Sequence, residues 1–176
     1  GLGQYLNGST IEVFGNAQEA VGDTMNAGEI VVHGNVGDAC GYAMRGGKIY
    51  IKGDCGYRAG IHMKAYQQHF PVMVVGGKAG SFLGIGQNGA YPVNNFCGTG
   101  MHGGKIVLRC DKAPTDLPRQ VLVNEVSADD MTEFAPYIKE YAQLFGADAE
   151  NLLSQKYFVL TPNPEAGYKQ LYTFEA

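Results

Sequence analysis

The chain has 176 residues, with 13 Lys and Arg against 17 Asp and Glu, which gives a net charge of −4 at pH 7. This mildly acidic balance, without a basic block, argues against a nucleic-acid partner. The sequence shows no apolar run of about 18 residues and no basic-then-apolar leader, so we expect a cytoplasmic protein with no membrane partner.

Glycine is the unusual part of the composition. The chain has 26 glycines, which is about twice the average share. Glycine permits positive φ and close approach of backbones, but it weakens ordinary helices and strands. The length suits one domain with an appendage, and the glycine content requires an architecture that turns often.

A repeat begins at Leu6. In rows of nineteen residues, LNGSTIEVFGNAQEAVGDT is followed by MNAGEIVVHGNVGDACGYA and MRGGKIYIKGDCGYRAGIH. Ile11, Ile30 and Ile49 share one column, and glycines recur in others. A short alternating strand followed by glycine turns, at a fixed short period, predicts an all-β fold, namely a single-stranded parallel β-helix (solenoid) with coils of about 19 residues. Six rows fit, ending near Arg119.

The column beside these isoleucines predicts a contact surface. It holds Glu12, Val31, Tyr50 and Val107, and the period of two along each strand turns it outward. Three of these four residues are apolar, and adjacent coils would bring Val31 and Tyr50 about 5 Å apart. We expect a protein partner to cover Val31, Tyr50 and Val107. The alternative is that the chain's own C-terminal helix packs there.

Two segments interrupt the regular pattern, at residues 64–75 and 87–96. In the first segment, Tyr66, His69 and Phe70 replace the glycine turn and displace the strand to residues 72–75. Interruptions in a solenoid map to loops on one face, which is often the binding face. These three side chains therefore either fill a packed loop or contact a partner, and the sequence does not decide between the two.

The stretch GTGMHGGKIVLRC, from Gly98 to Cys110, fits the dinucleotide-binding pattern G-x-G-x-x-G. That motif must open a helix, whereas β-branched residues follow Gly103 and predict a strand. The glycines belong to the repeat instead, because CGTGMHGGKIVLR from Cys97 aligns with CGYAMRGGKIYIK from Cys40. We therefore expect no cofactor-binding residue in this chain.

Residue types suited to catalysis or metal binding form no recognisable group. The cysteines make no C-x-x-C motif, and Cys40 and Cys97 would lie three coils, roughly 14 Å, apart. His33 and His102 share columns with polar residues that we expect to be solvated. No Ser–His–Asp, Cys–His or paired-carboxylate arrangement can be argued. We expect no catalytic and no metal-binding residues, and whether the chain is an enzyme in its own right stays open.

The composition changes after the last row with a clear strand, so we divide the chain into a β-helix domain at 1–112 and a C-terminal extension at 113–176. Ser127 is a suitable helix cap and Gly146 a suitable helix end. The extension predicts a strand, a helix, a short helix and a strand at Gln120–Val126, Ser127–Gly146, Ala149–Gln155 and Tyr157–Thr161. It either caps an open solenoid end or docks another subunit.

The repeat resembles a known family. The segments GDTMNAGEI, GYAMRGGKI and GTGMHGGKI, and the opening GLGQYLNGSTIEVFGNAQEAVGDTMNAGEIVVHG, are similar to the glycine-repeat (GXGXG) C-terminal domain of the large (alpha) subunit of glutamate synthase. A related domain forms one of the subunits of formylmethanofuran dehydrogenase. The resemblance covers Gly1–Arg109 and implies a right-handed β-helix that carries no catalytic residue.

The resemblance also implies a function. It points to a non-catalytic scaffold of a glutamate synthase-like complex, which makes glutamate from glutamine and 2-oxoglutarate. The scaffold would hold the glutaminase and flavin synthase parts together, with FMN and iron–sulfur clusters in those partners and none in this chain. The alternatives are a scaffold of the formylmethanofuran dehydrogenase type, and an independent β-helix enzyme or binding protein that uses the loops 64–75 and 87–96.

Overall fold

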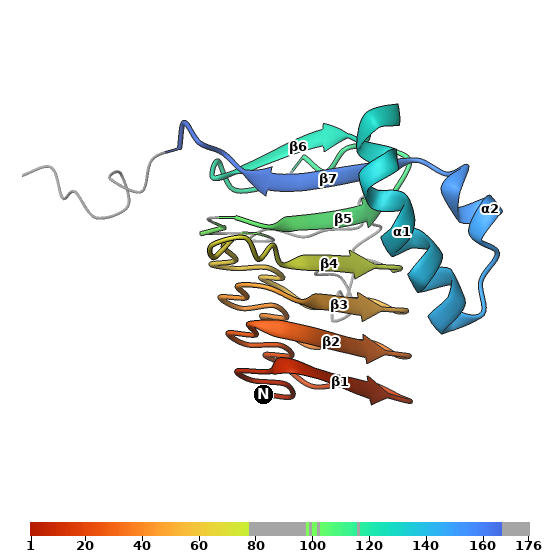
Figure 1. Cartoon of the computed structure of the whole chain (residues 1–176). Helices are drawn as coiled ribbons and strands as arrows, with labels where there is room; N and C mark the ends of the chain where they lie inside the picture. The colour runs from red at the N-terminus through yellow and green to blue at the C-terminus, as the bar shows by residue number, and fades with distance from the viewer. Residues whose placement is uncertain (78–97, 99, 102, 116, 167–176) are drawn as a thin grey trace, which may run out of the picture.

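One strand from each successive coil stacks into a single sheet (Figure 1). The computed structural model describes residues 1–77, 98, 100–101, 103–115 and 117–166. Its seven-stranded sheet has the order β1-β2-β3-β4-β5-β7-β6. The elements in chain order are β1 (Asn7–Val13), β2 (Ala27–Val32), β3 (Lys48–Ile51), β4 (Val72–Val75), β5 (Lys105–Arg109), β6 (Val121–Glu125), α1 (Ala128–Phe145), α2 (Ala149–Leu153) and β7 (Tyr157–Pro162).

The columns of the repeat are the rungs of this sheet. Strands β1 to β5 pair in parallel, with Ile11 opposite Ile30 and Ile30 opposite Ile49. The ladder continues through Met73 in β4 and Ile106 in β5. The predicted parallel β-helix is confirmed, and so is the displacement of the fourth strand into the bounds of β4.

The described sheet has one parallel strand fewer than the repeat has rows. β4 pairs directly with β5, with Met73 opposite Ile106, so the parallel part of the sheet has five described strands where six rows were expected. The fifth row contains the segment GQNGAYPVNNF, whose residues lack the alternation of apolar and polar side chains that predicts a strand. The expected loop 87–96 lies outside the described residues, as do Cys97 and His102.

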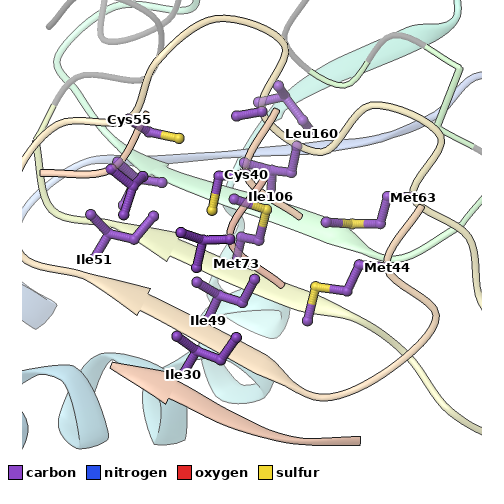
Figure 2. Packing of buried hydrophobic residues seen from close by; sticks show 14 of the residues in the cluster. Ile30, Cys40, Met44, Ile49, Ile51, Cys55, Met63, Met73, Ile106 and Leu160 are labelled. Atoms are coloured by element: carbon purple, nitrogen blue, oxygen red, sulfur yellow. The ribbon is translucent and has the colours of Figure 1, made fainter. Parts of the chain in front are cut away.

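The inside of the coils is packed with apolar side chains (Figure 2). Ile30, Ile49 and Ile106 are fully buried and stack along one wall. Methionine and cysteine columns fill the rest of the interior, because their flexible or small side chains suit a narrow core. The fully buried members of these columns are Met25, Met44, Met63, Cys40 and Cys55.

The turns of the coils require residues in the left-handed conformation. Gly22, Gly41 and Gly60 have φ values of 69°, 68° and 67°. Each of these backbones also passes close to the apolar ladder, so that a Cβ added to Gly22 would lie 2.5 Å from Cδ1 of Ile49. Glycine is therefore favoured there for its conformation and for its lack of a side chain.

The C-terminal extension closes one end of the solenoid. β7 pairs antiparallel with β5, and β6 pairs antiparallel with β7, so these two strands cover the β5 edge of the sheet. α1 follows β6, and its N-cap is Ser127, whose side chain accepts a hydrogen bond from the Asp130 N–H in a capping box. Its C-cap is Gly146, which has a φ of 66°. All four elements predicted for the extension are present.

Candidate functional surfaces

The outward column predicted as a partner surface lies under α1. Val31, Tyr50 and Val107 are 1%, 0% and 2% exposed, in a cluster that includes Phe134 and Ile138 of α1. The chain's own helix therefore covers this column, and the expectation that a protein partner does so is corrected. The physical reason is that α1 carries an apolar stripe and is already tethered to the sheet, so its packing has no cost of association.

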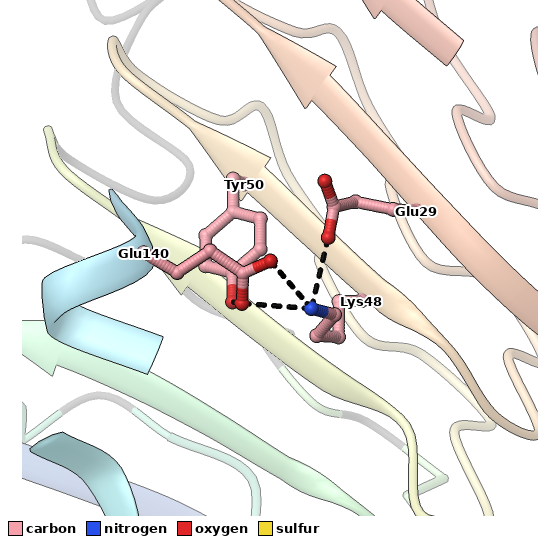
Figure 3. A network of polar contacts seen from close by, with 4 residues as sticks. All are labelled: Glu29, Lys48, Tyr50 and Glu140. Carbon is pink, nitrogen blue, oxygen red and sulfur yellow. Dashed lines mark hydrogen bonds and ion pairs between the residues drawn. The ribbon is translucent and has the colours of Figure 1, made fainter. Parts of the chain in front are cut away.

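A charged network crosses the interface between α1 and the sheet (Figure 3). Lys48 Nζ in β3 lies 2.9 Å from Glu29 Oε2 in β2 and 2.6 Å from Glu140 Oε1 in α1. The Tyr50 hydroxyl donates to Glu140 Oε2 at 2.6 Å. Tyr50 is thus fully buried with its hydroxyl satisfied, as buried polar groups require.

This network shifts the pKa values of its members. Burial raises the pKa of Glu29, and the adjacent Glu140 carboxylate adds to that shift. Burial also opposes ionisation of Glu140, but hydrogen bonds from Lys48 and Tyr50 outweigh it and lower the pKa of Glu140. Burial is the main reason that the pKa of Tyr50 is raised. A charged Lys48 and Glu140 beside a neutral Tyr50 therefore fasten α1 to the sheet.

The first part of the insertion at residues 64–75 forms a tight turn between Tyr66 and His69, before β4. The N–H groups of Tyr66 and His69 each donate to the other residue's carbonyl, at 3.1 and 3.0 Å. Tyr66 is 54% exposed and Phe70 63% exposed, and His69 is exposed as well. The structure therefore brings these three predicted residues together at the surface, where partner contact remains a prediction.

A cavity of about 260 Å³ lies between this turn and the first coils. Arg45, which lines the cavity, is not among the site residues predicted from the sequence. The repeat does contain a signal for this polar column, because Asn7 and Asn26 occupy the same column as Arg45 in the two preceding rows. The residues that line the cavity with polar groups are Asn7, Asn26, Arg45, Tyr66, Gln67 and His69.

The end of the solenoid opposite the cap leaves a sheet edge uncovered in the described structure. β1 pairs with β2 on one side only, and most of its side chains are exposed. Phe14 is 80% exposed and Tyr5 64% exposed. Phe14 stacks on His33, with 4.6 Å between ring centroids. Exposed aromatic side chains beside an open strand edge are typical of a surface that contacts another polypeptide.

Chemically reactive groups are few in the described part of the chain. It contains no group of three or more His, Cys, Asp or Glu side chains placed to hold a metal ion. Cys40 and Cys110 are free thiols. Burial raises the pKa of Cys110 to about 11, so this thiol is a poor nucleophile at neutral pH. No described helix is both long enough and apolar enough to cross a membrane.

Two comparisons with known proteins bear on this architecture. The uncharacterized protein MJ1350 of Methanocaldococcus jannaschii is 42% identical to this chain in an alignment of 190 positions that covers 98% of this chain and 73% of that relative. The family model described as GXGXG motif matches residues 1–159, well beyond Arg109, where the resemblance in the repeat ends. The chain therefore belongs to the GXGXG motif family, the glycine-repeat domain of glutamate synthase type.

Proposed function

We propose that this chain is a non-catalytic scaffold of a glutamate synthase-like complex that holds the glutaminase and flavin synthase parts together. FMN and iron–sulfur clusters would reside in those partners. Family membership supports a glutamate synthase-like context. The observation that carries the proposal is the asymmetry of the described sheet, in which β7 and β6 cover the β5 edge whereas the β1 edge pairs with no other described strand (Figure 1).

The open end has the properties of a docking surface. A strand edge presents unpaired N–H and C=O groups to which another polypeptide can add. Phe14 and Tyr5 offer aromatic side chains beside that edge, and burying one such side chain contributes about 1.5–3 kcal/mol. α1 covers the outward face of β2 to β5, so the first coil is the part of the sheet best placed to receive a partner.

The insertion loop is a second proposed contact. Tyr66, His69 and Phe70 project from a turn fixed by its own backbone hydrogen bonds, so presenting them requires little ordering. In Figure 1 this loop lies where β4 begins, whereas α1 crosses the sheet near the other end of that strand. A scaffold with contacts at its β1 edge and at this loop can touch two different parts of a complex.

Copurification tests the proposal. The chain is coexpressed with the flavin-containing synthase part of the same organism, and Phe14→Arg is compared with Leu122→Arg on β6 at the capped end, where Leu122 is 39% exposed. We expect Phe14→Arg to reduce recovery of flavin absorbance at least tenfold, Leu122→Arg to leave it unchanged, and both variants to keep the parent melting temperature. Phe70→Arg tests the loop separately.

The possible outcomes separate the candidate functions. Equal recovery of the flavoprotein by Phe14→Arg and the parent would reject the open end as the docking surface. Failure of the parent chain to recover any flavoprotein would reject the glutamate synthase-like context. A stable complex without flavin would favour a scaffold of the formylmethanofuran dehydrogenase type instead.

A further inference from the structure

We propose that the cavity beside Arg45 binds a small molecule through its carboxylate group. The inference does not depend on the proposed scaffold function, because it rests on the contacts around Arg45 alone. The inference requires that hydrogen-bonded parts of the fold build the cavity, that Arg45 have an unmet hydrogen bond, and that the lining favour one negative charge.

The walls of the cavity come from the stacked coils and from the insertion turn. The Asn26 N–H donates to the Leu6 carbonyl, and the Arg45 N–H donates to the Met25 carbonyl, each at 2.8 Å. These ladder bonds stack Asn7, Asn26 and Arg45 one above the other. The insertion turn reaches back over this column, and its His69 side chain lies so near Gly46 that a Cβ built there would be 3.1 Å from His69 Cβ.

Arg45 has an unmet hydrogen-bonding requirement. Within the described part of the chain, its Nε is the only buried side-chain nitrogen or oxygen without a hydrogen-bond partner. Lys48 and Lys156, by contrast, are paired with Glu140 and Glu125. A buried guanidinium N–H left unpaired is unfavourable, and a small movement of the half-buried Arg45 side chain toward the cavity would let an anionic acceptor make a strong, charge-assisted bond to it.

The lining selects the charge and shape of the acceptor. Among the described residues, the lining includes no Asp or Glu, and Arg45 is its one permanently charged side chain. The amides of Asn7, Asn26 and Gln67 and the Tyr66 hydroxyl supply neutral donors. A single guanidinium matches the charge and the planar fork of one carboxylate better than a doubly charged phosphate. A volume of about 260 Å³ is near the lower limit of ligand pockets, which suits a small metabolite.

Nuclear magnetic resonance of the Arg45 Nε–H group gives a direct test. The full chain, labelled with ¹⁵N, is titrated with propionate, a monocarboxylate, while chloride keeps the ionic strength constant, and the same titration is made with inorganic phosphate. We expect propionate to shift and sharpen the Arg45 Nε–H resonance with a Kd on the order of 1 mM, and phosphate to bind more weakly. No shift with propionate, or stronger binding of phosphate, would overturn the proposal.

Matched variants exclude a nonspecific effect of charge. Arg45→Gln removes the guanidinium, whereas Lys64→Gln removes a charge from the same column one coil further along, at an exposed position that does not line the cavity. We expect propionate-induced shifts of the cavity amides to disappear in Arg45→Gln and to persist in Lys64→Gln. Equal loss in both variants, or none in Arg45→Gln, would reject the site. If Arg45→Gln does not fold, the titration of the parent chain still decides.

Discussion

The approach of Gly22 to Ile49 can be tested by a pair of substitutions. Gly22→Ala places a methyl group 2.5 Å from Ile49 Cδ1, at a residue with a φ of 69°. Ile49→Val deletes that Cδ1 atom. The next neighbours of the new methyl group, Ile30 Cδ1 at 3.4 Å and Ile49 Cγ1 at 3.5 Å, are at ordinary contact distances. The second substitution should therefore make room for the first.

The expected loss in the free energy of unfolding is the sum of a backbone contribution and an overpacking contribution. An L-residue in the left-handed region costs about 1–2 kcal/mol, and overpacking of a tight core costs about 1–3 kcal/mol. Gly22→Ala alone should thus lower the free energy of unfolding by about 2–5 kcal/mol. Ile49→Val alone should lower it by about 0.5–1.5 kcal/mol. In the double variant the free energy of unfolding should fall by about 1–3 kcal/mol less than the sum of the two single losses, because Ile49→Val removes the atom that the new methyl group overpacks.

Urea denaturation of the parent, both single variants and the double variant measures this coupling. The control pairs Ile49→Val with Gly60→Ala, whose added Cβ would meet Ile106 Cδ1 at 2.4 Å and not Ile49. The control pair should be additive to within about 0.5 kcal/mol. Additivity of the Gly22 and Ile49 pair within the same margin would refute the stacking of this turn on the ladder.

Two further predictions concern α1. Ser127→Ala removes the acceptor of the Asp130 N–H and should lower the free energy of unfolding by about 1 kcal/mol in the same urea assay; an unchanged value would show that the capping box contributes nothing. The pKa of Glu140 is lowered from its ordinary value of 4.5, so its contribution to stability is complete above that pH and is lost as the pH falls through the lowered pKa. Melting curves of the parent and of Glu140→Gln should therefore differ most near neutral pH and converge below pH 4.5, and a constant difference would contradict the assignment.

Much of the fold could be predicted because its determinants recur at fixed spacing. The column of Ile11, Ile30 and Ile49 needs only the period of the repeat to be found, and the sheet pairs these residues in that register. The caps of α1 are equally local, since Ser127 and Gly146 act within one turn of the helix. The repeat period and the helix caps can therefore both be predicted from a single sequence.

The remaining features depend on contacts between distant segments. An apolar column on a sheet has the same sequence pattern whether a partner or a helix of the same chain covers it, so Tyr50 could not be assigned in advance. Its carboxylate partner, Glu140, lies 90 residues further along the chain. The surroundings of Arg45 are likewise completed by the insertion turn, whose direction no local pattern specifies.

The bridge from Lys48 to Glu140 also affects how the molecule folds. In a simple solenoid each coil touches only its neighbours, so coils can open one at a time from an end. Here a contact between residues 92 positions apart joins the middle of the coil stack to the helix that follows it. Coils held by α1 must therefore open together with the helix, whereas β1, which the helix leaves uncovered, can fray alone. This long-range contact also slows folding, because a large loop must close before the contact can form.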